Sequence, residues 1–219
     1  MPVKYSKDGK VCFHSETHTY WNGYKPLKGV TTHIGEHKEE FDSINQAAKY
    51  AEKNNLQPWD VLYSWRTKGN SSRDNGTSAH GVFETYFETK SIPPLSGTKD
   101  HVAAKFINDY FETGKLTFVE CESIVYNDEL ASMRDCVARN IHSEHFIFDW
   151  KANEKISTDN YGKFLLPPYA HIPACSFYEY SLQVRLYQKM STDYDIKDCF
   201  IVHLKENDYQ ILKAADVLC

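Results

Sequence analysis

The chain has 219 residues, of which 41% are hydrophobic and 14% aromatic, a composition that supports one substantial core and excludes a disordered or collagen-like chain. Its formal net charge is −5, from 25 basic and 30 acidic side chains, so the whole surface is not suited to coating nucleic acid nonspecifically. Residues 76–219 carry the acidic excess, with 21 acidic against 14 basic side chains. A region rich in carboxylates can bind a divalent cation, and the bound cation can in turn bind a phosphate.

The first third of the chain predicts a hairpin and two helices. Residues 11–21 predict two short strands around Ser15 and Glu16, followed by a turn at Asn22-Gly23. Helices are predicted over 43–54 and 58–68, the second with Pro58 in its first turn. We expect residues 1–75 to form an N-terminal hairpin and helical lobe packed on a core made by residues 76–219.

The remaining residues predict helices and strands in a mixed order. Helices are expected over 76–89 and 101–113, strands over 116–126, 130–139 and 145–152, a helix over 175–190, and a closing hairpin of 199–204 and 209–212. This order predicts an α/β fold, with a mixed central β-sheet flanked by helices.

A charged pair interrupts the apolar strand predicted at 145–152. Asp149 and Lys151 are two residues apart and therefore share one face, while Trp150 faces the other way. If the connection at 140–144 is symmetric, Asp135 lies directly across from Asp149, where Cβ atoms are about 4.5–5.5 Å apart. Two carboxylates held this close against their repulsion form a reasonable site for a hard divalent cation.

Other side chains have the chemistry to join such a site. Lys151 could orient and polarise a water molecule for attack on phosphorus. His80 and Glu84, one helical turn apart, could supply an imidazole and a carboxylate. Gln183 and Tyr187 repeat that spacing on the later helix, where an amide and a phenol could hold a phosphate or the lysine.

An ordered series of motifs carries a family resemblance. The blocks are Gly76-Thr-Ser-Ala-His80-Gly-Val-Phe-Glu84, Glu122, Leu130-Ala-Ser-Met-Arg-Asp135, Phe148-Asp149-Trp150-Lys151 and Tyr180-Ser-Leu-Gln183-Val-Arg-Leu-Tyr187. Together they resemble the PD-(D/E)XK nuclease superfamily, closest to its RecB-like and phage exonuclease branch, with a mitochondrial genome-maintenance exonuclease as a further relative. The resemblance covers about residues 30–190 and implies a restriction-endonuclease-like core at 76–219.

The resemblance implies Mg²⁺- or Mn²⁺-dependent hydrolysis of DNA, with one or two ions bound. The implied metal ligands are His80, Asp135, Asp149 and the backbone carbonyl of Trp150. The implied catalytic residues are Asp135, Asp149, Lys151, Glu122, Gln183 and Tyr187. Lys151 would position the attacking water, and Glu122 would have a supporting role. Gln183 and Tyr187 would belong to the family's QxxxY motif.

Two positions depart from the family pattern. Ser132 stands three residues before the first Asp, where the family usually has Gly, and Arg134 stands just before that Asp, where an apolar residue is usual. Neither removes a ligand, and Arg134 is expected to alter the strand edge or contact DNA.

Basic and aromatic residues precede the helix that carries His80. This segment contains Trp59, Trp65, Arg66, Lys68 and Arg73. The aromatic side chains could stack on single-stranded bases while the basic ones contact phosphates, or all five could pack a helical lobe. Together with Arg134, Gln183 and Tyr187, the three basic residues of this segment are the candidate DNA-binding residues.

The cysteines and the remaining histidines indicate no second metal centre. None of the six cysteines forms a CxxC pair, so we expect free thiols and no iron–sulfur cluster. A zinc site is suggested by two sets of residues, the first being Cys12, His14 and His18 and the second His33 and His37. Neither set is followed by a second pair of residues at ligand spacing that would complete a zinc site.

The sequence also bears on location. The longest stretch without Asp, Glu, Lys or Arg is the 15 residues Phe164–Tyr178, interrupted by prolines, and it cannot span a bilayer as a helix. The N-terminus lacks the apolar segment of a signal peptide. We therefore expect no membrane partner and a cytoplasmic protein, in the host cytoplasm if it is viral.

The function predicted from these residues is a metal-dependent deoxyribonuclease, expected to be an exonuclease in DNA processing, recombination or repair of a phage or mobile element. Its expected partners are single- or double-stranded DNA and a recombination or replication protein. Two alternatives stay open: a catalytically silent nuclease-fold protein that binds DNA or acts as an inhibitor, and a structural subunit that uses its 31 aromatic side chains for protein contacts.

Overall fold

The N-terminal segment folds into a small antiparallel sheet and one short helix. A computed structural model describes residues 3–218. Four strands come first, and the last of them leads directly into a helix: β1 (Val3–Tyr5), β2 (Val11–His14), β3 (Thr19–Asn22), β4 (Lys25–Gly29) and α1 (Val30–Glu36). The predicted hairpin is confirmed, with Phe13 opposite Tyr20, and the sequence analysis missed β1, β4 and α1.

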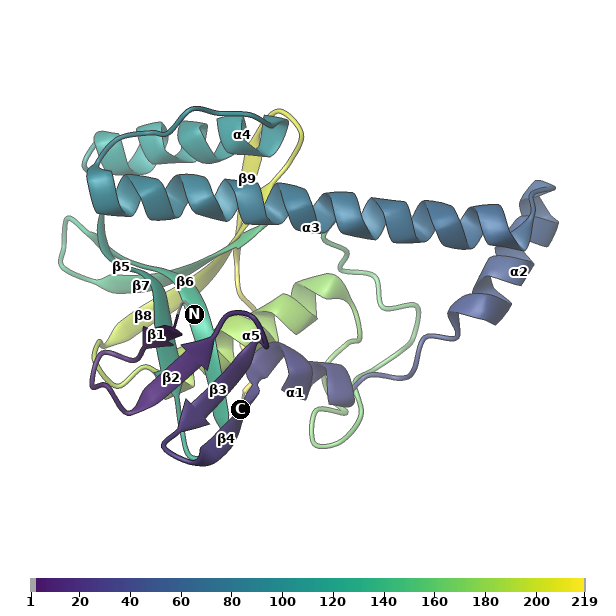
Figure 1. The fold of residues 1–219 in the computed structure, drawn as a ribbon, viewed down its shortest axis with the longest axis horizontal. Helices are drawn as coiled ribbons and strands as arrows, with labels where there is room; N and C mark the ends of the chain where they lie inside the picture. The colour runs from purple at the N-terminus through teal and green to yellow at the C-terminus, as the bar shows by residue number, and fades with distance from the viewer. Residues whose placement is uncertain (1–2, 219) are drawn as a thin grey trace.

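The next segment forms an arm that leaves the body of the protein (Figure 1). It consists of α2 (Ser43–Asn54) and the N-terminal half of α3 (Pro58–Thr89). Pro58 begins α3, as predicted. The expectation of two separate helices at 58–68 and 76–89 is wrong, because α3 runs without a break through the polar residues between them. It therefore also crosses the domain boundary that we placed after residue 75.

The rest of the chain follows the predicted order closely. The elements are α4 (Thr98–Phe106), a π-helical segment η1 (Ile107–Glu112), β5 (Leu116–Tyr126), β6 (Leu130–Asn140), β7 (His145–Lys151), α5 (Ser176–Met190), β8 (Ile196–Leu204) and β9 (Tyr209–Lys213). Over residues 3–218 these make an α/β protein with an open, mixed nine-strand sheet and five α-helices.

The sheet divides at β6. Its order is β1-β2-β3-β4-β6-β7-β8-β9, and β5 pairs with the other edge of β6. The start of β6 pairs in parallel with β4, at Leu130 and Ala131. The end of β6 pairs antiparallel with β7, beginning at Cys136 opposite Phe148. Residues 132–135 of β6 therefore lie in a fork between β4 and β7.

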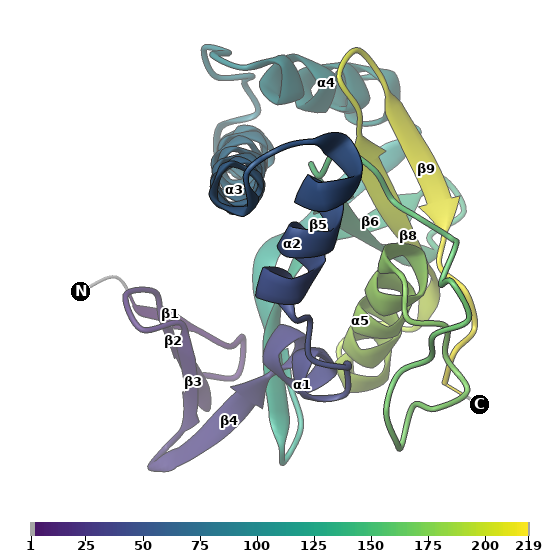
Figure 2. The same cartoon turned by 90° about the vertical axis from the view of Figure 1, so that its right-hand side faces the viewer.

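Helices cover both faces of the sheet (Figure 2). On one face, α3 and α4 bury Phe83, Phe106 and Trp150, and the Phe83 ring stacks on the Trp150 ring with centroids 3.9 Å apart. On the other face, α1 and α5 pack on Ile147 and its neighbours. Trp150 faces α3 and Asp149 faces α5, which confirms the prediction that the two side chains lie on opposite faces of the strand.

Two further features concern the expectations about thiols and membranes. The cysteines within residues 3–218 are free thiols, and Cys219 lies outside the described residues. None of the helices described in this range has the length and apolar character needed to cross a membrane.

Candidate metal centre

The fork in the sheet places Asp135 at the centre of the candidate site. The predicted register is confirmed up to Cys136 opposite Phe148, and the next pair would set Asp135 opposite Asp149. There the ladder changes, since the backbone N–H of Trp150 donates to Oδ2 of Asp135, at 2.8 Å, rather than to a backbone carbonyl. The carboxylate thus occupies the opening between the two strands, with 7% of the residue exposed.

His80 reaches this carboxylate from α3. Its Nε2 lies 3.6 Å from Oδ2 of Asp135 and 3.3 Å from the carbonyl oxygen of Trp150, and its Nδ1 lies 3.2 Å from Oε1 of Glu122. Burial lowers the pKa of His80, but the carboxylates of Asp135 and Glu122 outweigh it and raise the pKa to about 9. Without a metal ion, the imidazolium therefore supplies the positive charge between the two carboxylates.

Glu122 comes from a distorted position in the middle of β5. Its backbone φ is +48°, a left-handed conformation that is unfavourable for a residue with a side chain. A register irregularity precedes it in the β5–β6 ladder, between Phe118 and Glu120. Such distortions re-aim side chains next to functional sites, and here the carboxylate meets His80.

The side chains of His80, Glu122 and Asp135 offer the kinds of atoms that bind a divalent cation. Within the described residues, His80, Glu122 and Asp135 are the group of metal-ligating side chains that could hold an ion, with their ligand atoms all within 4.8 Å of one another. The Trp150 carbonyl adds a fourth donor beside His80. Oxygen donors with one imidazole suit Mn²⁺ and, less strongly, Mg²⁺. Glu122, for which a supporting role is expected, thus belongs to the group that could hold an ion.

Asp149 is fully buried and stands beside this group with different partners. Its Oδ2 lies 2.6 Å from Nζ of Lys151, and its Oδ1 accepts from Nε2 of Gln183 at 3.3 Å. Burial raises the pKa of Asp149, and Asp135 nearby adds to that effect, while Lys151 opposes it. The structure brings Asp135 and Asp149 to one site but gives Asp149 the lysine as its closest charged neighbour.

Lys151 stays an ammonium in this environment. Burial lowers its pKa, but Asp149 and Asp135 outweigh burial, so the pKa is raised above the ordinary value. Its Nζ also lies 4.8 Å from the centre of the Tyr180 ring, a cation–π contact. A protonated lysine can hold a water molecule or stabilise negative charge, but it cannot take a proton.

The side chains of the QxxxY motif support this arrangement from α5. Nε2 of Gln183 donates to the hydroxyl of Tyr187 at 2.6 Å as well as to Asp149, and the Ser132 hydroxyl donates to Tyr187 at 3.1 Å. Ser132, the departure from the family pattern, thus anchors Tyr187 next to the fork. Both Gln183 and Tyr187 are buried, so neither side chain is exposed for the direct DNA contact expected of it.

Arg134 does not have the DNA-binding role expected for it. Its side chain is 1% exposed and meets Glu120 at 2.5 Å and Asp193 at 3.1 Å, with further hydrogen bonds to Ser123 and Ser191. A guanidinium buried among four partners cannot reach a phosphate, so Arg134 instead ties β6 to β5 and to the segment after α5.

The other predicted residues fall into two groups. Glu84 lies on α3 one turn beyond His80, but its carboxylate pairs with Lys4 at 2.7 Å, so it is not placed as a ligand. Arg66, Lys68 and Arg73 are exposed on α3, on the part that extends from the body.

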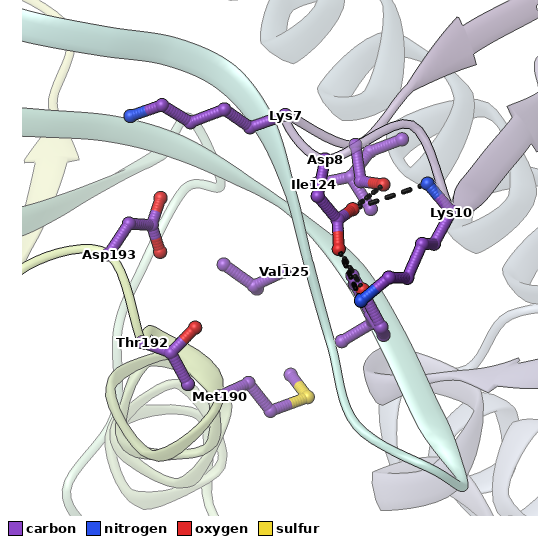
Figure 3. Close-up of a pocket in the computed structure, with 10 residues that line it drawn as sticks. Lys7, Asp8, Lys10, Ile124, Val125, Met190, Thr192 and Asp193 are labelled. Atoms are coloured by element: carbon purple, nitrogen blue, oxygen red, sulfur yellow. Dashed lines mark hydrogen bonds and ion pairs between the residues drawn. The ribbon is translucent and has the colours of Figure 1, made fainter.

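A cavity of about 400 Å³ lies elsewhere, between the N-terminal turn, β5 and the end of α5 (Figure 3). Lys7, Lys10 and Asp193 line its polar side, and Val125 and Met190 its apolar side. It contains none of the predicted site residues. Of the histidines considered for zinc, His33 meets the Tyr169 hydroxyl through Nε2 at 3.0 Å and His14 contacts Cys12 through Nε2 at 3.8 Å. Neither belongs to the group within residues 3–218 that could hold an ion.

The sequence did not predict the contact of Ser132 with Tyr187, the contact of Tyr180 with Lys151 or the place of Glu122 beside His80. Tyr180 is three residues before Gln183 on α5, and this spacing could have placed it near Lys151. Glu122 depends on a left-handed backbone that no residue pattern indicates. Comparison with known proteins adds no assignment, because no protein-family model matches the chain and a search of curated proteins found no relative.

Proposed function

We propose that this protein is a metal-dependent deoxyribonuclease that hydrolyses phosphodiester bonds, with Mn²⁺ or Mg²⁺ held by His80, Glu122, Asp135 and the carbonyl of Trp150. The observation that carries the proposal is the convergence of these donors at the fork of the sheet, directly beside the Asp149–Lys151 pair. Carboxylates, one imidazole and a charged lysine are the groups that metal-assisted phosphodiester hydrolysis uses.

The donor set has the chemistry for such an ion, with its ligand atoms within 4.8 Å of one another. In its absence the protonated His80 sits between two carboxylates, so a proton supplies the charge that an ion would bring. When bound, the metal would stabilise negative charge on the phosphoryl oxygens and lower the pKa of a water ligand. Because His80 must lose its proton to coordinate, we expect ion binding to weaken as pH falls.

The protein's own residues would then position the reactants. Lys151, charged and paired with Asp149, would orient the attacking water and stabilise the charge that develops in the transition state. Gln183 holds Asp149 in place, and Tyr187 holds Gln183. The second carboxylate of the predicted pair thus acts mainly by fixing the lysine.

The experiment that tests this proposal uses linear, circular and single-stranded DNA with an end label, incubated with Mn²⁺, Mg²⁺ or EDTA. We expect cleavage with Mn²⁺, weaker cleavage with Mg²⁺ and none with EDTA. Lys151→Ala and Asp149→Asn should abolish cleavage while circular dichroism shows an intact fold. Cleavage that persists in both variants would reject the assignment of these residues.

One alternative is favoured by a specific observation. The Asp149–Lys151 ion pair is closed and fully buried on the aspartate side, an arrangement that a silent nuclease-fold DNA-binding protein could also have. Binding of DNA in EDTA, with no cleavage under either metal, would favour that function. Calorimetry with Mn²⁺ tests the remaining alternative, a structural subunit without a metal site. Such a subunit should bind the ion only weakly and nonspecifically.

A further inference from the structure

The arm carries a row of side chains that ends at the candidate site. The uninterrupted helix α3 carries four residues at seven-residue intervals: Trp59, Arg66, Arg73 and His80. Seven residues fall about 20° short of two helical turns, so the four side chains lie along one side of the helix with a slow drift. We call these four residues the α3 row. Because His80 faces Asp135 and Glu122, the row leads from the arm to the metal site.

The two arginines of the row are exposed and free of other partners. Within residues 3–218, neither Arg66 nor Arg73 forms an ion pair or a side-chain hydrogen bond. Arg134 and Arg185, by contrast, are buried and each meets two carboxylates. Unpaired guanidiniums at this spacing are available to an external anion, and the phosphates of a nucleic acid offer anions in a row.

Aromatic rings extend the row at its far end. Trp59 is 78% exposed, and Tyr63, one turn further on, is 74% exposed. Tyr63 is also one turn before Arg66, so the two rings and the first guanidinium form one continuous patch. Exposed rings next to cations are the groups on which unpaired bases stack.

We propose that the α3 row binds the backbone of single-stranded DNA and leads it to the metal site, with Trp59 and Tyr63 stacking on bases at the far end. This inference rests on the proposed function and specifies its substrate. A duplex fits less well, because its bases are already stacked and offer no free ring faces to Trp59.

The geometry sets the length of DNA that the row can engage. At 1.5 Å per residue, Arg73 lies about 10 Å, Arg66 about 21 Å and Trp59 about 31 Å from His80 along the helix axis. A stacked strand, with phosphates about 3.4 Å apart, needs about nine nucleotides to reach Trp59 from His80, and a stretched strand needs fewer. A strand of about four stacked nucleotides that starts at His80 should therefore reach Arg73 and not Trp59.

Lys68 provides a matched control. It is a third exposed cation of the same helix, but it lies about 140–160° around the axis from Arg73 and Arg66. A general attraction of DNA to basic side chains would involve all three residues alike. A row would involve Arg66 and Arg73 only.

The test measures binding of a fluorescent single strand of about 15 nucleotides by anisotropy in EDTA, so that no cleavage is needed. We expect Arg66→Ala and Arg73→Ala each to weaken binding about fivefold and to lower the slope of log K against log salt by about 0.7. Trp59→Ala should weaken binding about tenfold with little change in that slope. Lys68→Ala should change neither quantity by more than a small fraction of these effects.

Three results would overturn the proposal. These are an effect of Lys68→Ala equal to that of the arginine variants, no effect of either arginine, or binding of a duplex or an RNA strand in preference to single-stranded DNA. A further check uses length, since a strand of about four nucleotides cannot span the row from Trp59 to His80 and should bind more weakly than a strand of about nine. Because binding is measured in EDTA, loss of the row is distinguishable from failure of the nuclease proposal, which cleavage by the unchanged protein decides.

Discussion

The two halves of α3 differ in what surrounds them, although they belong to one helix. The C-terminal half packs on the sheet, where Phe83 is fully buried against Trp150. The N-terminal half extends from the body with α2 as its companion and exposes Trp59 and Tyr63. A small cluster around Ala47, Ala51 and Val61, together with a contact between the rings of Tyr50 and Trp65, joins the two helices of the arm. The rings of the core half are buried among other rings, whereas in the arm half Trp65 contacts the rings of Phe41 and Tyr50 while Trp59 and Tyr63 stay exposed.

The charges of the two regions differ in the same way. In the body, Arg134 is paired with Glu120 and Asp193, and Lys151 with Asp149. On the arm, the exposed arginines have no partner within residues 3–218. Since a buried charge needs a partner whereas an exposed charge does not, this difference separates residues that hold the fold from residues that are free for binding.

The largest expected effect compares an aromatic residue from each half of α3. Phe83→Ala should lower the free energy of unfolding by about 3–5 kcal/mol, because it leaves a cavity beside Trp150. Trp59→Ala should change it by less than about 0.5 kcal/mol, because the ring is exposed. Urea denaturation measures both. A loss of several kcal/mol for Trp59→Ala would show that the arm is part of the core.

The second prediction concerns a paired charge of the body. Burial raises the pKa of Glu120, but hydrogen bonds from Arg134 and Tyr194 outweigh it and lower the pKa to about 2. Since the folded pKa is below the ordinary value, Glu120 stabilises the fold above about pH 4.5, and this stability is lost as pH falls towards 2. The contribution is about 3 kcal/mol.

Denaturation at pH 7 and at pH 3 checks this prediction. Glu120→Gln should be less stable at pH 7 and should lose less stability between the two pH values than the unchanged protein. Arg66→Ala on the arm serves as the control and should keep the pH dependence of the unchanged protein. Equal pH dependence in Glu120→Gln and the unchanged protein would contradict the assigned role of the Arg134 pair.

The third prediction concerns the distorted strand. Glu122→Gln should weaken Mn²⁺ binding by about tenfold or more, because a neutral amide replaces a carboxylate beside His80. Glu84→Gln is the matched control, because Glu84 lies near His80 on α3 but pairs with Lys4. Calorimetry measures both affinities. Equal effects in the two variants would mean that Glu122 is not a ligand.

The strands and helices of the body were largely predictable from sequence. The limits of β5, β6 and β7 differ from the predicted ones by one residue at most, because β-branched and aromatic residues in alternation identify strands directly. The symmetric connection after Asn140 also gave the correct register, which placed Asp135 and Asp149 near each other. Both predictions depend on residues that lie close together in the sequence.

The features that sequence did not predict depend on distant parts of the chain. β4 is short and contains Pro26, and its place in the sheet depends on pairing with β6, about a hundred residues away. The burial of Arg134 depends on Glu120 and Asp193, which no motif connects. The left-handed backbone of Glu122 follows from neither propensity nor spacing.

The continuity of α3 leads to the smallest and most local prediction. The segment between the halves contains Gly69, Asn70 and Ser71, which are weak helix formers. No atom lies within 4 Å of a Cβ placed at Gly69, so Gly69→Ala adds no clash and should stabilise the helix by about 0.5–1 kcal/mol.

This gain should appear as slower amide hydrogen exchange in residues 66–75, with the global free energy of unfolding nearly unchanged, because the segment contributes little to the core. The α3 row requires this segment to be helical, since a break would remove the alignment of Arg66 with His80. Gly69→Ala should therefore keep or improve single-stranded DNA binding. Weaker binding in a variant with slower exchange would mean that DNA binds an arm bent at Gly69, and would refute the straight row while leaving the metal site untouched.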